Sequence, residues 1–249
     1  MSSRATGRTP RRRGPGDDIP LARRSSPPQP PRRSVASRFR RTLLAAVAVA
    51  ATSAALVIGP LRPWLTPPPV AGLKARLSAD GRLLGHFPYP EVQARHLVAI
   101  APGLELHADA GEALQAMKRA AAADGIELVV VSAFRSISLQ RHLFFDVGAE
   151  RNQTPQARAQ VSAPPGFSEH STGYAVDLAD GRRPDTNLST SFDGTPAFAW
   201  LAANAARHHF QLSFPRNNRQ GVSYEPWHWR YVGSTDALQL FEAAHRLAR

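Results

Sequence analysis

Cysteine is absent from the 249-residue sequence, and its absence removes several classes of site. Disulfide staples, thiolate nucleophiles and cysteine-based zinc or iron–sulfur centres are all excluded. Any metal ion would have to be held by histidine, aspartate or glutamate. The lack of disulfides does not define the cell compartment. Apolar residues make up 43% of the chain, which is enough to build a core and excludes a wholly disordered protein.

Acidic residues are scarce only at the beginning of the chain. Residues 1–41 hold 12 arginines and two acids, whereas residues 42–249 hold 19 basic and 17 acidic residues. The net charge of +12 therefore belongs almost entirely to a tail rich in arginine, proline and serine. Such a composition buries little apolar surface, so residues 1–41 are predicted to be a disordered cytoplasmic tail. Nucleic-acid binding is the alternative, which the near absence of aromatic residues from the tail disfavours.

Residues 43–59 form an apolar run without any charge. With its flanking residues the run approaches the length of a membrane span, so residues 42–61 are predicted to be a transmembrane signal anchor. The arginines before it place residues 1–41 in the cytoplasm and the residues that follow the run on the other side of the membrane. A signal peptide cleaved near Ser53–Ala55 and a buried alanine-rich core helix are the alternatives. Residues 62–72, rich in proline, are predicted to be a stiff linker.

Residues 73–249 mix helical and strand periodicity and are predicted to form one α+β domain with mainly antiparallel strands. Strands are expected at 127–134, 174–179 and 227–232. A hairpin is expected from segments 73–77 and 82–87, which flank an Asp-Gly turn. Helices are expected at 110–123, 137–147, 195–208 and 234–248, with a short one starting at Thr154-Pro155.

Three blocks of sequence carry polar residues that a plain strand or turn does not need. In the first block, Arg135 lies where a strand ends and a helix begins, and Gln140 follows five residues later. An arginine at such a junction can present its guanidinium group to a carboxylate in a bidentate geometry. Taken alone, the block is more typical of a surface arginine, so its meaning depends on the two blocks that follow.

In the second block, Asp177 shares a strand face with two small residues, Ala175 and Ala179, which leave room in front of the carboxylate. His170 lies seven residues earlier, across a turn at Gly173. The two side chains can converge on one cation, and histidine together with a carboxylate suits zinc.

In the third block, Glu225 and Pro226 precede the strand that carries His228. Pro226 disfavours a helix at Glu225, so the block is not the helical zinc motif H-E-x-x-H. Glu225 is expected to lie beside the metal without ligating it, where a general base belongs.

Together the blocks supply two histidines and one aspartate, His170, Asp177 and His228, with a fourth position open for water. That is the ligand set of a catalytic zinc ion. The zinc would polarise the scissile carbonyl and supply hydroxide, and Glu225 would transfer the water proton to the leaving amine. Arg135 would bind the terminal carboxylate of the substrate. The residues therefore predict a zinc carboxypeptidase.

The segments SAFRSISLQ, PPGFSEHSTGYAVDL and EPWHWRYVG resemble the three signature blocks of VanY-type D-alanyl-D-alanine carboxypeptidases. These enzymes belong to a wider group that includes lysostaphin-type peptidases and the hedgehog domain. The resemblance covers roughly Asp80 to Val232 and implies a small antiparallel sheet flanked by helices, with zinc in a groove on the sheet. One departure is Phe134, where many members have tyrosine.

Carried over residue by residue, the resemblance implies that His170, Asp177 and His228 ligate zinc and that Glu225 is the catalytic base. It also implies a substrate-binding set: Arg135, Gln140, Ser168 and Trp227. The expected reaction is removal of C-terminal D-alanine from peptidoglycan stem peptides. The alternatives are an L,D-carboxypeptidase, a dipeptidase or an endopeptidase of the same fold, and a non-catalytic peptidoglycan-binding module.

Overall fold

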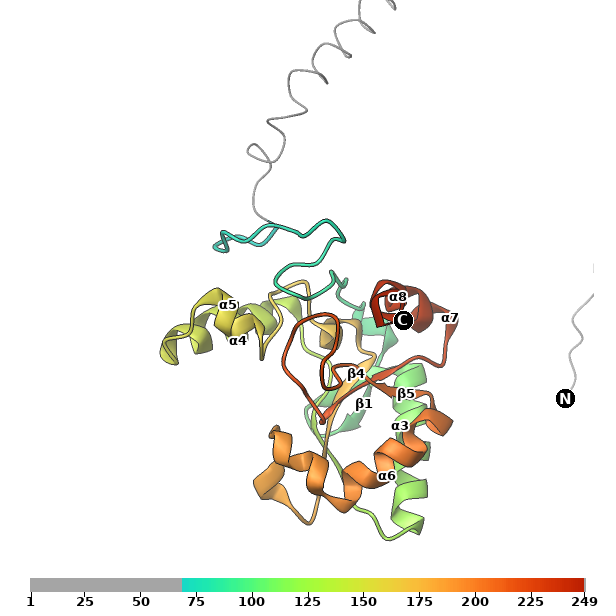
Figure 1. Ribbon diagram of the computed structural model, residues 1–249. Helices are drawn as coiled ribbons and strands as arrows, with labels where there is room; N and C mark the ends of the chain where they lie inside the picture. Colours follow the sequence, from blue (N-terminus) through green and yellow to red (C-terminus); the bar gives the residue numbers. More distant parts are fainter. Residues whose placement is uncertain (1–68, 249) are drawn as a thin grey trace, which may run out of the picture. The chain divides into compact units, whose positions relative to one another are not determined.

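The computed structural model describes residues 69–248, which form an α+β unit with two antiparallel sheets (Figure 1). The larger sheet has the strand order β3-β4-β6-β5. Its strands are β3 (Leu128–Ser132), β4 (Ala175–Asp180), β6 (His228–Tyr231) and β5 (Phe210–Leu212). The smaller sheet is a hairpin of β1 (Leu97–Ala101) and β2 (Leu104–His107). The predicted α+β class with antiparallel strands is confirmed.

The central strand β4 is buried along its whole length and pairs with β3 on one side and β6 on the other. Val176 and Leu178 belong to the main hydrophobic core, and Asp177 points to the opposite face because strand side chains alternate. In the register of the sheet, Asp177 pairs with His228 on β6 and with Ser132 at the end of β3. The sheet therefore brings all three predicted blocks together around Asp177.

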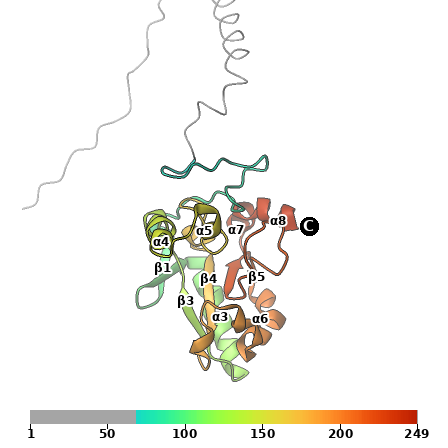
Figure 2. The same cartoon turned by 60° about the vertical axis from the view of Figure 1, so that its left-hand side comes forward.

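Two helices cover the core beside this sheet. Helix α3 (Ala108–Ala123) buries Leu114 and Met117 at helical spacing. It packs against the β1-β2 hairpin and β3, while α6 (Pro196–Asn204) packs against β4 and buries Leu201 (Figures 1 and 2). The apolar faces of these helices and of the sheet form one continuous hydrophobic cluster. This core holds β4 rigidly in place.

Helices α4 (Ile137–Glu150) and α5 (Pro155–Ala159) pack against each other (Figure 2). Each begins at a capping hydroxyl, Ser136 for α4 and Thr154 for α5, which accepts a hydrogen bond from the first helical turn. Beside them lies a second, smaller hydrophobic cluster, whose buried members are Val70, Leu73, Leu83, Phe144, Ala159 and Phe167. This part of the unit forms one wall of the site described below.

The long helices predicted near the end of the chain are each divided in two. The helix predicted at 234–248 is α7 (Thr235–Leu240) followed by α8 (Glu242–Ala248). The break falls at Phe241, which has φ −95° and ψ 5° and whose fully buried ring contacts Tyr89. The helix predicted at 195–208 is α6 followed by a 3-10 turn, η5 (Ala205–His208). The other 3-10 turns are η1 (Ala94–His96), η2 (Glu169–Thr172), η3 (Pro184–Thr186) and η4 (Thr190–Gly194).

The hairpin predicted from residues 73–77 and 82–87 is wrong. These segments share only an isolated bridge between Leu83 and His86. Leu73 and Leu83 are instead buried in the second hydrophobic cluster, so packing takes the place of strand pairing. Strands β1, β2 and β5 have no counterpart among the predicted strands, because they are short and partly exposed.

Within residues 69–248, no helix is both long and apolar enough to cross a membrane. The predicted tail 1–41 and the predicted transmembrane anchor 42–61 lie outside the described residues, as does most of the predicted linker 62–72. These assignments, and the start of the predicted domain at residue 73, stay predictions.

Candidate metal centre

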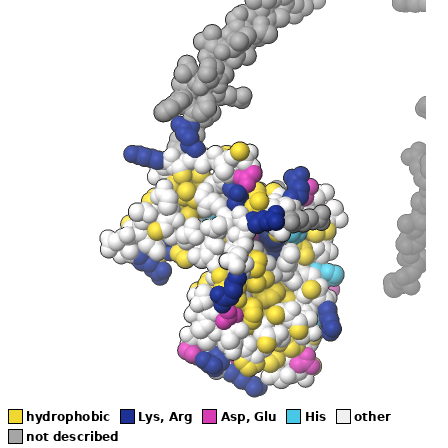
Figure 3. All heavy atoms as spheres, viewed as in Figure 1, with side chains coloured by type: hydrophobic (Ala, Val, Ile, Leu, Met, Phe, Trp, Pro, Cys, Tyr) yellow, Lys and Arg dark blue, Asp and Glu magenta, His cyan; other side chains and the backbone are white. Residues whose placement is uncertain are grey.

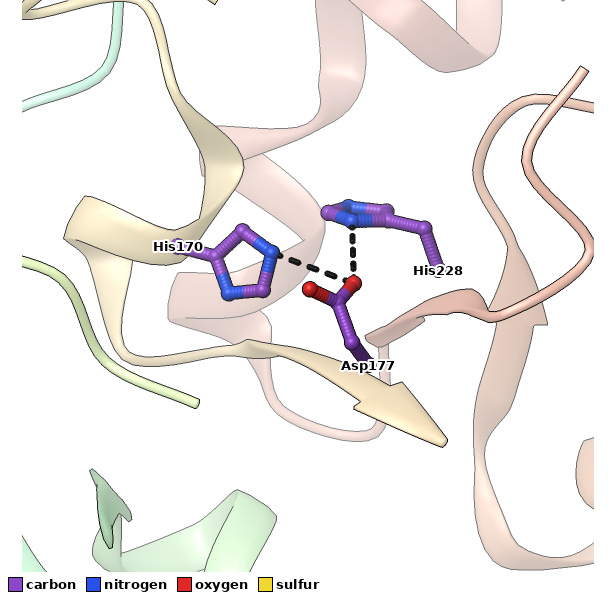
Figure 4. Close-up of side chains that lie close together, drawn as sticks. All are labelled: His170, Asp177 and His228. Carbon is purple, nitrogen blue, oxygen red and sulfur yellow. Dashed lines mark hydrogen bonds and ion pairs between the residues drawn. The ribbon is translucent and has the colours of Figure 1, made fainter. Parts of the chain in front are cut away.

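Three potential metal ligands meet on one face of β4 (Figure 4). His170 comes from the turn η2, Asp177 from β4 and His228 from the first residue of β6. Their ligand atoms lie within 4.8 Å of one another, and all three residues are buried. This spacing fits one metal ion held between two imidazoles and a carboxylate.

The turn between His170 and β4 depends on Gly173. This residue ends η2 with φ +72°, in the left-handed region that favours glycine. A Cβ atom at this position would lie 3.0 Å from the backbone nitrogen of His107 and 3.2 Å from the side chain of Leu97. A larger residue would strain the turn. Gly173 is therefore the local reason that a histidine and an aspartate seven residues apart face each other.

Hydrogen bonds behind the two histidines decide which ring nitrogen faces the centre. Nδ1 of His170 lies 2.7 Å from the Ala133 carbonyl oxygen, which only accepts, so Nδ1 carries the proton. Nε2 of His170 is buried without a hydrogen-bond partner and lies 3.3 Å from Asp177 Oδ1. Nδ1 of His228 lies 3.1 Å from the same oxygen, and its Nε2 lies 3.0 Å from Glu169 Oε2. A metal ion could bind Nε2 of His170, which has no other partner among the described residues, together with Nδ1 of His228 and Oδ1 of Asp177.

The charges at the centre also favour a cation. Burial lowers the pKa of His170 to about 4, so this ring is neutral at pH 7. Burial acts in the same direction on His228, but the hydrogen bonds and charges of Asp177 and Glu169 outweigh it and raise the pKa of His228 to about 10. Without a bound cation, His228 would therefore hold an extra proton. A divalent cation would displace that proton, as metal binding to histidine does in general.

Glu225 lies beside the three ligands, as predicted. Its Oε2 is 3.9 Å from His228 Nδ1, and its side chain is 15% exposed. Its backbone N–H donates to the Phe214 carbonyl at 3.1 Å, which holds the chain in place just before Pro226. Burial raises the pKa of Glu225 to about 7. A carboxyl group with this pKa can both accept and return a proton near neutral pH.

Arg135 approaches the second oxygen of Asp177, with its Nη2 3.8 Å from Oδ2. Its backbone N–H donates to the His170 carbonyl at 3.3 Å, which ties the end of β3 to the turn η2. Nε of Arg135 is buried and has no hydrogen-bond partner. Burial lowers the pKa of this guanidinium group. A buried guanidinium with an unused donor suits an anionic ligand.

All of these groups line one cavity of about 740 Å³. The cavity contains the metal ligands, Glu225 and all four residues predicted to bind substrate, Arg135, Gln140, Ser168 and Trp227. Nε2 of Gln140 donates to the Ala163 carbonyl at 2.7 Å, whereas its buried Oε1 has no partner. The cavity therefore offers an unused donor on Arg135 and an unused acceptor on Gln140.

A second cavity of about 820 Å³ lies beside β5 and is lined mainly by apolar residues of α6, β5 and β6. Figure 3 shows apolar side chains gathered on the face that carries α6 and β5. No acidic residue lines this second cavity. The cavity around Asp177, in contrast, is lined by Glu169, Glu225, both histidines of the triad and Arg135.

One residue of the site, Glu169, was not predicted. Its buried carboxylate accepts hydrogen bonds from His228 Nε2, from Arg230 Nη1 at 2.8 Å and from the Ser213 hydroxyl at 2.6 Å. The available signal was Arg230, which shares a face of β6 with His228, since residues two apart on a strand point to the same side. An arginine buried on that face requires a buried acid as its partner.

Comparison with known proteins identifies the family. The family model for VanY, D-alanyl-D-alanine carboxypeptidase, matches residues 103–234, more than half of the chain. This chain belongs to the VanY family. The resemblance inferred from the three blocks is confirmed, and every site residue named above falls within the matched range.

Individual VanY-type relatives agree with this assignment. A D-alanyl-D-alanine carboxypeptidase of Enterococcus faecalis is 36% identical over 138 residues, which cover 51% of this chain and 48% of the relative. The chain thus matches about half of that relative's length. A structure of the LdcB LD-carboxypeptidase has 31% identity and a TM-score of 0.50, covering 58% of this chain and 70% of the other. A mutant of the D,D-pentapeptidase VanY in complex with Zn(II) has 28% identity and a TM-score of 0.50, covering 66% and 94%.

In this VanY-family chain, the fold brings together every residue that the sequence singled out. His170 and His228 lie 3.3 and 3.1 Å from Asp177 Oδ1. Glu225 and Arg135 flank this group of three. The remaining three, Gln140, Ser168 and Trp227, line the same cavity. Their individual roles stay predictions and are taken up below.

Proposed function

We propose that this chain is a zinc-dependent carboxypeptidase that removes the C-terminal D-alanine from peptidoglycan stem peptides. The observation that carries the proposal is the position of Glu225 and Arg135 next to the same metal triad. Glu225 Oε2 lies 3.9 Å from His228 Nδ1, and Arg135 Nη2 lies 3.8 Å from Asp177 Oδ2, in one cavity. Hydrolysis of the last peptide bond of a chain needs a base and an anion-binding group within a few ångströms of the metal ligands. The E. faecalis relative and the Zn(II) complex of VanY support the substrate class and the metal.

The zinc ion would be held by Nε2 of His170, Oδ1 of Asp177 and Nδ1 of His228. When bound, zinc would supply Lewis-acid chemistry, polarising the scissile carbonyl and making water a stronger acid. Two histidines and one carboxylate leave a coordination position open, as catalytic zinc sites do. The unpartnered Nε2 of His170 is the feature of this chain that fits the ion best.

Glu225 would accept a proton from the attacking water and return it to the departing amine of D-alanine. Its pKa of about 7 in the chain without metal suits both transfers. Arg135 would bind the terminal carboxylate of the substrate, using the Nε donor that no residue of the described part of the chain satisfies. The free Oε1 of Gln140 would accept an N–H from the peptide, and Ser168 and Trp227 would complete the walls of this pocket.

An L,D-carboxypeptidase acting on tetrapeptides is the second candidate, and the likeness to the LdcB LD-carboxypeptidase favours it. The same metal ligands, base and guanidinium group would serve both reactions, because both release one residue with a free carboxylate. The two differ in the configuration of the residue before the scissile bond. An endopeptidase fits less well, because its substrate would bring no terminal carboxylate to Arg135.

We further propose that residues 42–61 anchor the protein in the bacterial cytoplasmic membrane. The uncharged run and the preceding arginines support this orientation, with residues 1–41 in the cytoplasm. The linker 62–72 would then carry the catalytic domain on the periplasmic or cell-wall side. Peptidoglycan stem peptides are found on that side, so the proposed topology and the proposed chemistry agree.

The test uses the full-length chain loaded with zinc and three synthetic stem peptides: a pentapeptide ending in D-Ala-D-Ala, its C-terminally amidated form and a tetrapeptide. Mass spectrometry should show loss of one alanine from the free pentapeptide and none from the amidated form. Glu225→Gln should still bind zinc but release alanine far more slowly than the wild type.

Three other outcomes would change the proposal. Cleavage of the tetrapeptide alone would favour L,D specificity. Equal cleavage of the amidated peptide would contradict the role of Arg135. Binding of the peptides to the zinc-loaded protein without cleavage would favour a non-catalytic peptidoglycan-binding module.

A further inference from the structure

A buried carboxylate lies directly behind one of the two histidines of the metal centre. The Glu169 side chain is 2% exposed, and its two oxygens have different partners. Oε2 accepts from His228 Nε2 at 3.0 Å and from the Ser213 hydroxyl at 2.6 Å. Oε1 accepts from Arg230 Nη1 at 2.8 Å and from the Tyr89 hydroxyl at 3.5 Å. Each oxygen of this carboxylate is therefore engaged, and only Oε2 contacts a histidine of the centre.

The other histidine of the centre is supported differently. Nδ1 of His170 donates to a neutral peptide carbonyl, that of Ala133, at 2.7 Å. His228 donates to an ionised carboxylate instead. A hydrogen bond to a carboxylate is about twice as strong as one to a neutral acceptor. The two ligands therefore receive unequal support from the protein, and His228 receives the stronger.

From this geometry we infer that Glu169 is a positioning residue for the metal ligand His228, acting through its Nε2–H. The inference rests on the metal site of the proposed function. Glu169 prevents the imidazole from rotating and keeps a proton on Nε2, so Nδ1, which lies 3.1 Å from Asp177 Oδ1, is the nitrogen whose proton a metal ion would replace. An anionic acceptor also makes the opposite nitrogen a stronger donor to a metal.

Neutralising Arg230 is the other role that Glu169 could have. Arg230 engages Oε1, which leaves Oε2 to His228 and Ser213. A carboxylate needed only for Arg230 would gain nothing from contact with an imidazole that faces a metal site. The two roles predict different results when the charge of Glu169 is removed, because one changes only stability and the other also changes metal affinity.

The experiment compares Glu169→Gln with the wild type, both as full-length chains. Zinc affinity is measured by competition with a chromophoric chelator, and thermal unfolding is followed on the metal-free proteins. We expect Glu169→Gln to bind zinc about 10–100-fold more weakly, the usual effect of losing such a partner. Glu242→Gln is the matched control, because Glu242 is exposed and, within residues 69–248, forms an ion pair with Arg246 alone, across one helical turn. It should bind zinc as the wild type does.

Unchanged zinc affinity in a folded Glu169→Gln protein, with lower thermal stability alone, would overturn the inference. If the variant does not fold, nitrogen-15 NMR of the wild type decides. The zinc-loaded protein should show His228 protonated on Nε2 and metallated on Nδ1, and the reverse pattern would overturn the inference. A wild-type protein that binds no zinc would overturn the proposed function as well. Tight zinc binding by both proteins would overturn only the role of Glu169.

Discussion

Two glutamates flank the candidate metal centre, Glu169 buried and Glu225 largely shielded, and their surroundings act on them in opposite directions. Burial by itself would raise the pKa of Glu169, but Arg230, His228 and Ser213 outweigh it and hold that pKa far below its usual range. Burial raises the pKa of Glu225 to about 7, because the nearby His228 and Arg135 offset only part of the effect. The better-paired glutamate, although it is the more deeply buried of the two, is thus a permanent anion, whereas the poorly paired one can accept a proton.

The two glutamates differ in pKa because they differ in their hydrogen-bond partners, and this difference suits them to different tasks. Glu169 has a short hydrogen bond or ion pair to each of its main partners, so it stays charged and holds a neighbour in position. In the described part of the chain Glu225 has no such partner: its Oε2 lies 3.9 Å from His228 Nδ1, which is too far for a hydrogen bond. A carboxyl group without strong partners can change its protonation during a reaction. Pairs of groups whose pKa values are driven apart in this way mark acid–base assignments.

The most demanding test of this comparison is the loss of the proton acceptor. Glu225→Gln should lower kcat by about 10²–10⁴-fold, because the amide cannot accept the proton of the attacking water. Zinc affinity should stay close to the wild-type value, since Glu225 is not one of the three proposed ligands. Steady-state kinetics on the free pentapeptide together with chelator competition measure both. A kcat within tenfold of the wild type would remove Glu225 from the base role.

Truncating each glutamate in turn tests their unequal structural roles. Glu169→Ala leaves the buried Arg230 without its partner and should lower the free energy of unfolding by about 3–5 kcal/mol. Glu225→Ala should change it by less than about 1 kcal/mol or raise it at pH 8, because a poorly paired buried charge is removed. Urea unfolding of the metal-free proteins measures both values. Equal losses at the two positions would contradict the comparison.

The pH dependence of stability should carry opposite signs for the two residues. Folded Glu225 binds its proton more tightly than the unfolded chain, so its stabilising contribution is present at low pH and is lost as pH rises from about 4.5 to about 7. The loss amounts to about 3 kcal/mol. The contribution of Glu169 is instead present above about pH 4.5 and is lost as pH falls.

Urea unfolding of metal-free wild type and Glu225→Gln at pH 5 and pH 7.5 isolates the Glu225 share of this dependence. The difference in unfolding free energy between wild type and variant should shift by about that amount between the two pH values. An identical pH dependence in both proteins would show that Glu225 keeps an ordinary pKa.

Arg135 links the comparison to the substrate. Arg135→Gln should raise KM for the free pentapeptide by about 10–100-fold, because a hydrogen bond to a charged group is lost. Its charge also lowers the pKa of Glu225, so the acid limb of the kcat profile should move to higher pH. Zinc affinity, measured by chelator competition, serves as the control and should change little. A loss of zinc affinity as large as the rise in KM would indicate a structural role.

The smallest effect on stability and zinc affinity is expected at Ser213, whose hydroxyl donates to the Glu169 carboxylate. Ser213→Ala removes one hydrogen bond to Glu169 Oε2 and should cost about 1 kcal/mol of unfolding free energy. Zinc affinity should fall by less than about threefold, since His228 and Arg230 keep their contacts. Thermal unfolding and chelator competition measure the two effects. A larger loss of zinc affinity would mean that the hydroxyl helps to orient the carboxylate.

Sequence periodicity was sufficient for the elements that carry the site. The helix predicted at 110–123 is α3, and the strand predicted at 174–179 is β4, each shifted by at most two residues. Both have a long apolar pattern that matches their burial. The hairpin predicted from 73–77 and 82–87 does not form, because Leu73 and Leu83 pack into the second hydrophobic cluster and this packing outweighs the local preference for a turn. The break at Phe241 has the same origin, since burial of one ring against Tyr89 divides the closing helix.

Residue types and their spacing were likewise enough to bring His170, Asp177, His228, Glu225 and Arg135 into one hypothesis. Each is a polar residue at a strand end or tight turn where the fold alone would not require it. The burial of Glu169 behind His228 could not be predicted, because nothing in its own segment distinguishes it from a surface acid beside a turn. Its importance comes from Arg230 and Ser213, which are distant in the sequence.

The order of the three blocks by itself determined the family, and it is also sufficient to propose the metal ligands and the reaction. The tertiary structure alone decided which nitrogen of each histidine faces the centre and which of two buried glutamates stays charged. Both outcomes depend on through-space distances of about 3–4 Å between groups separated by tens of residues, and electrostatic interactions at low dielectric change steeply over such distances. Folding sets these distances by packing the sheet against its helices, so no local pattern in the chain encodes them.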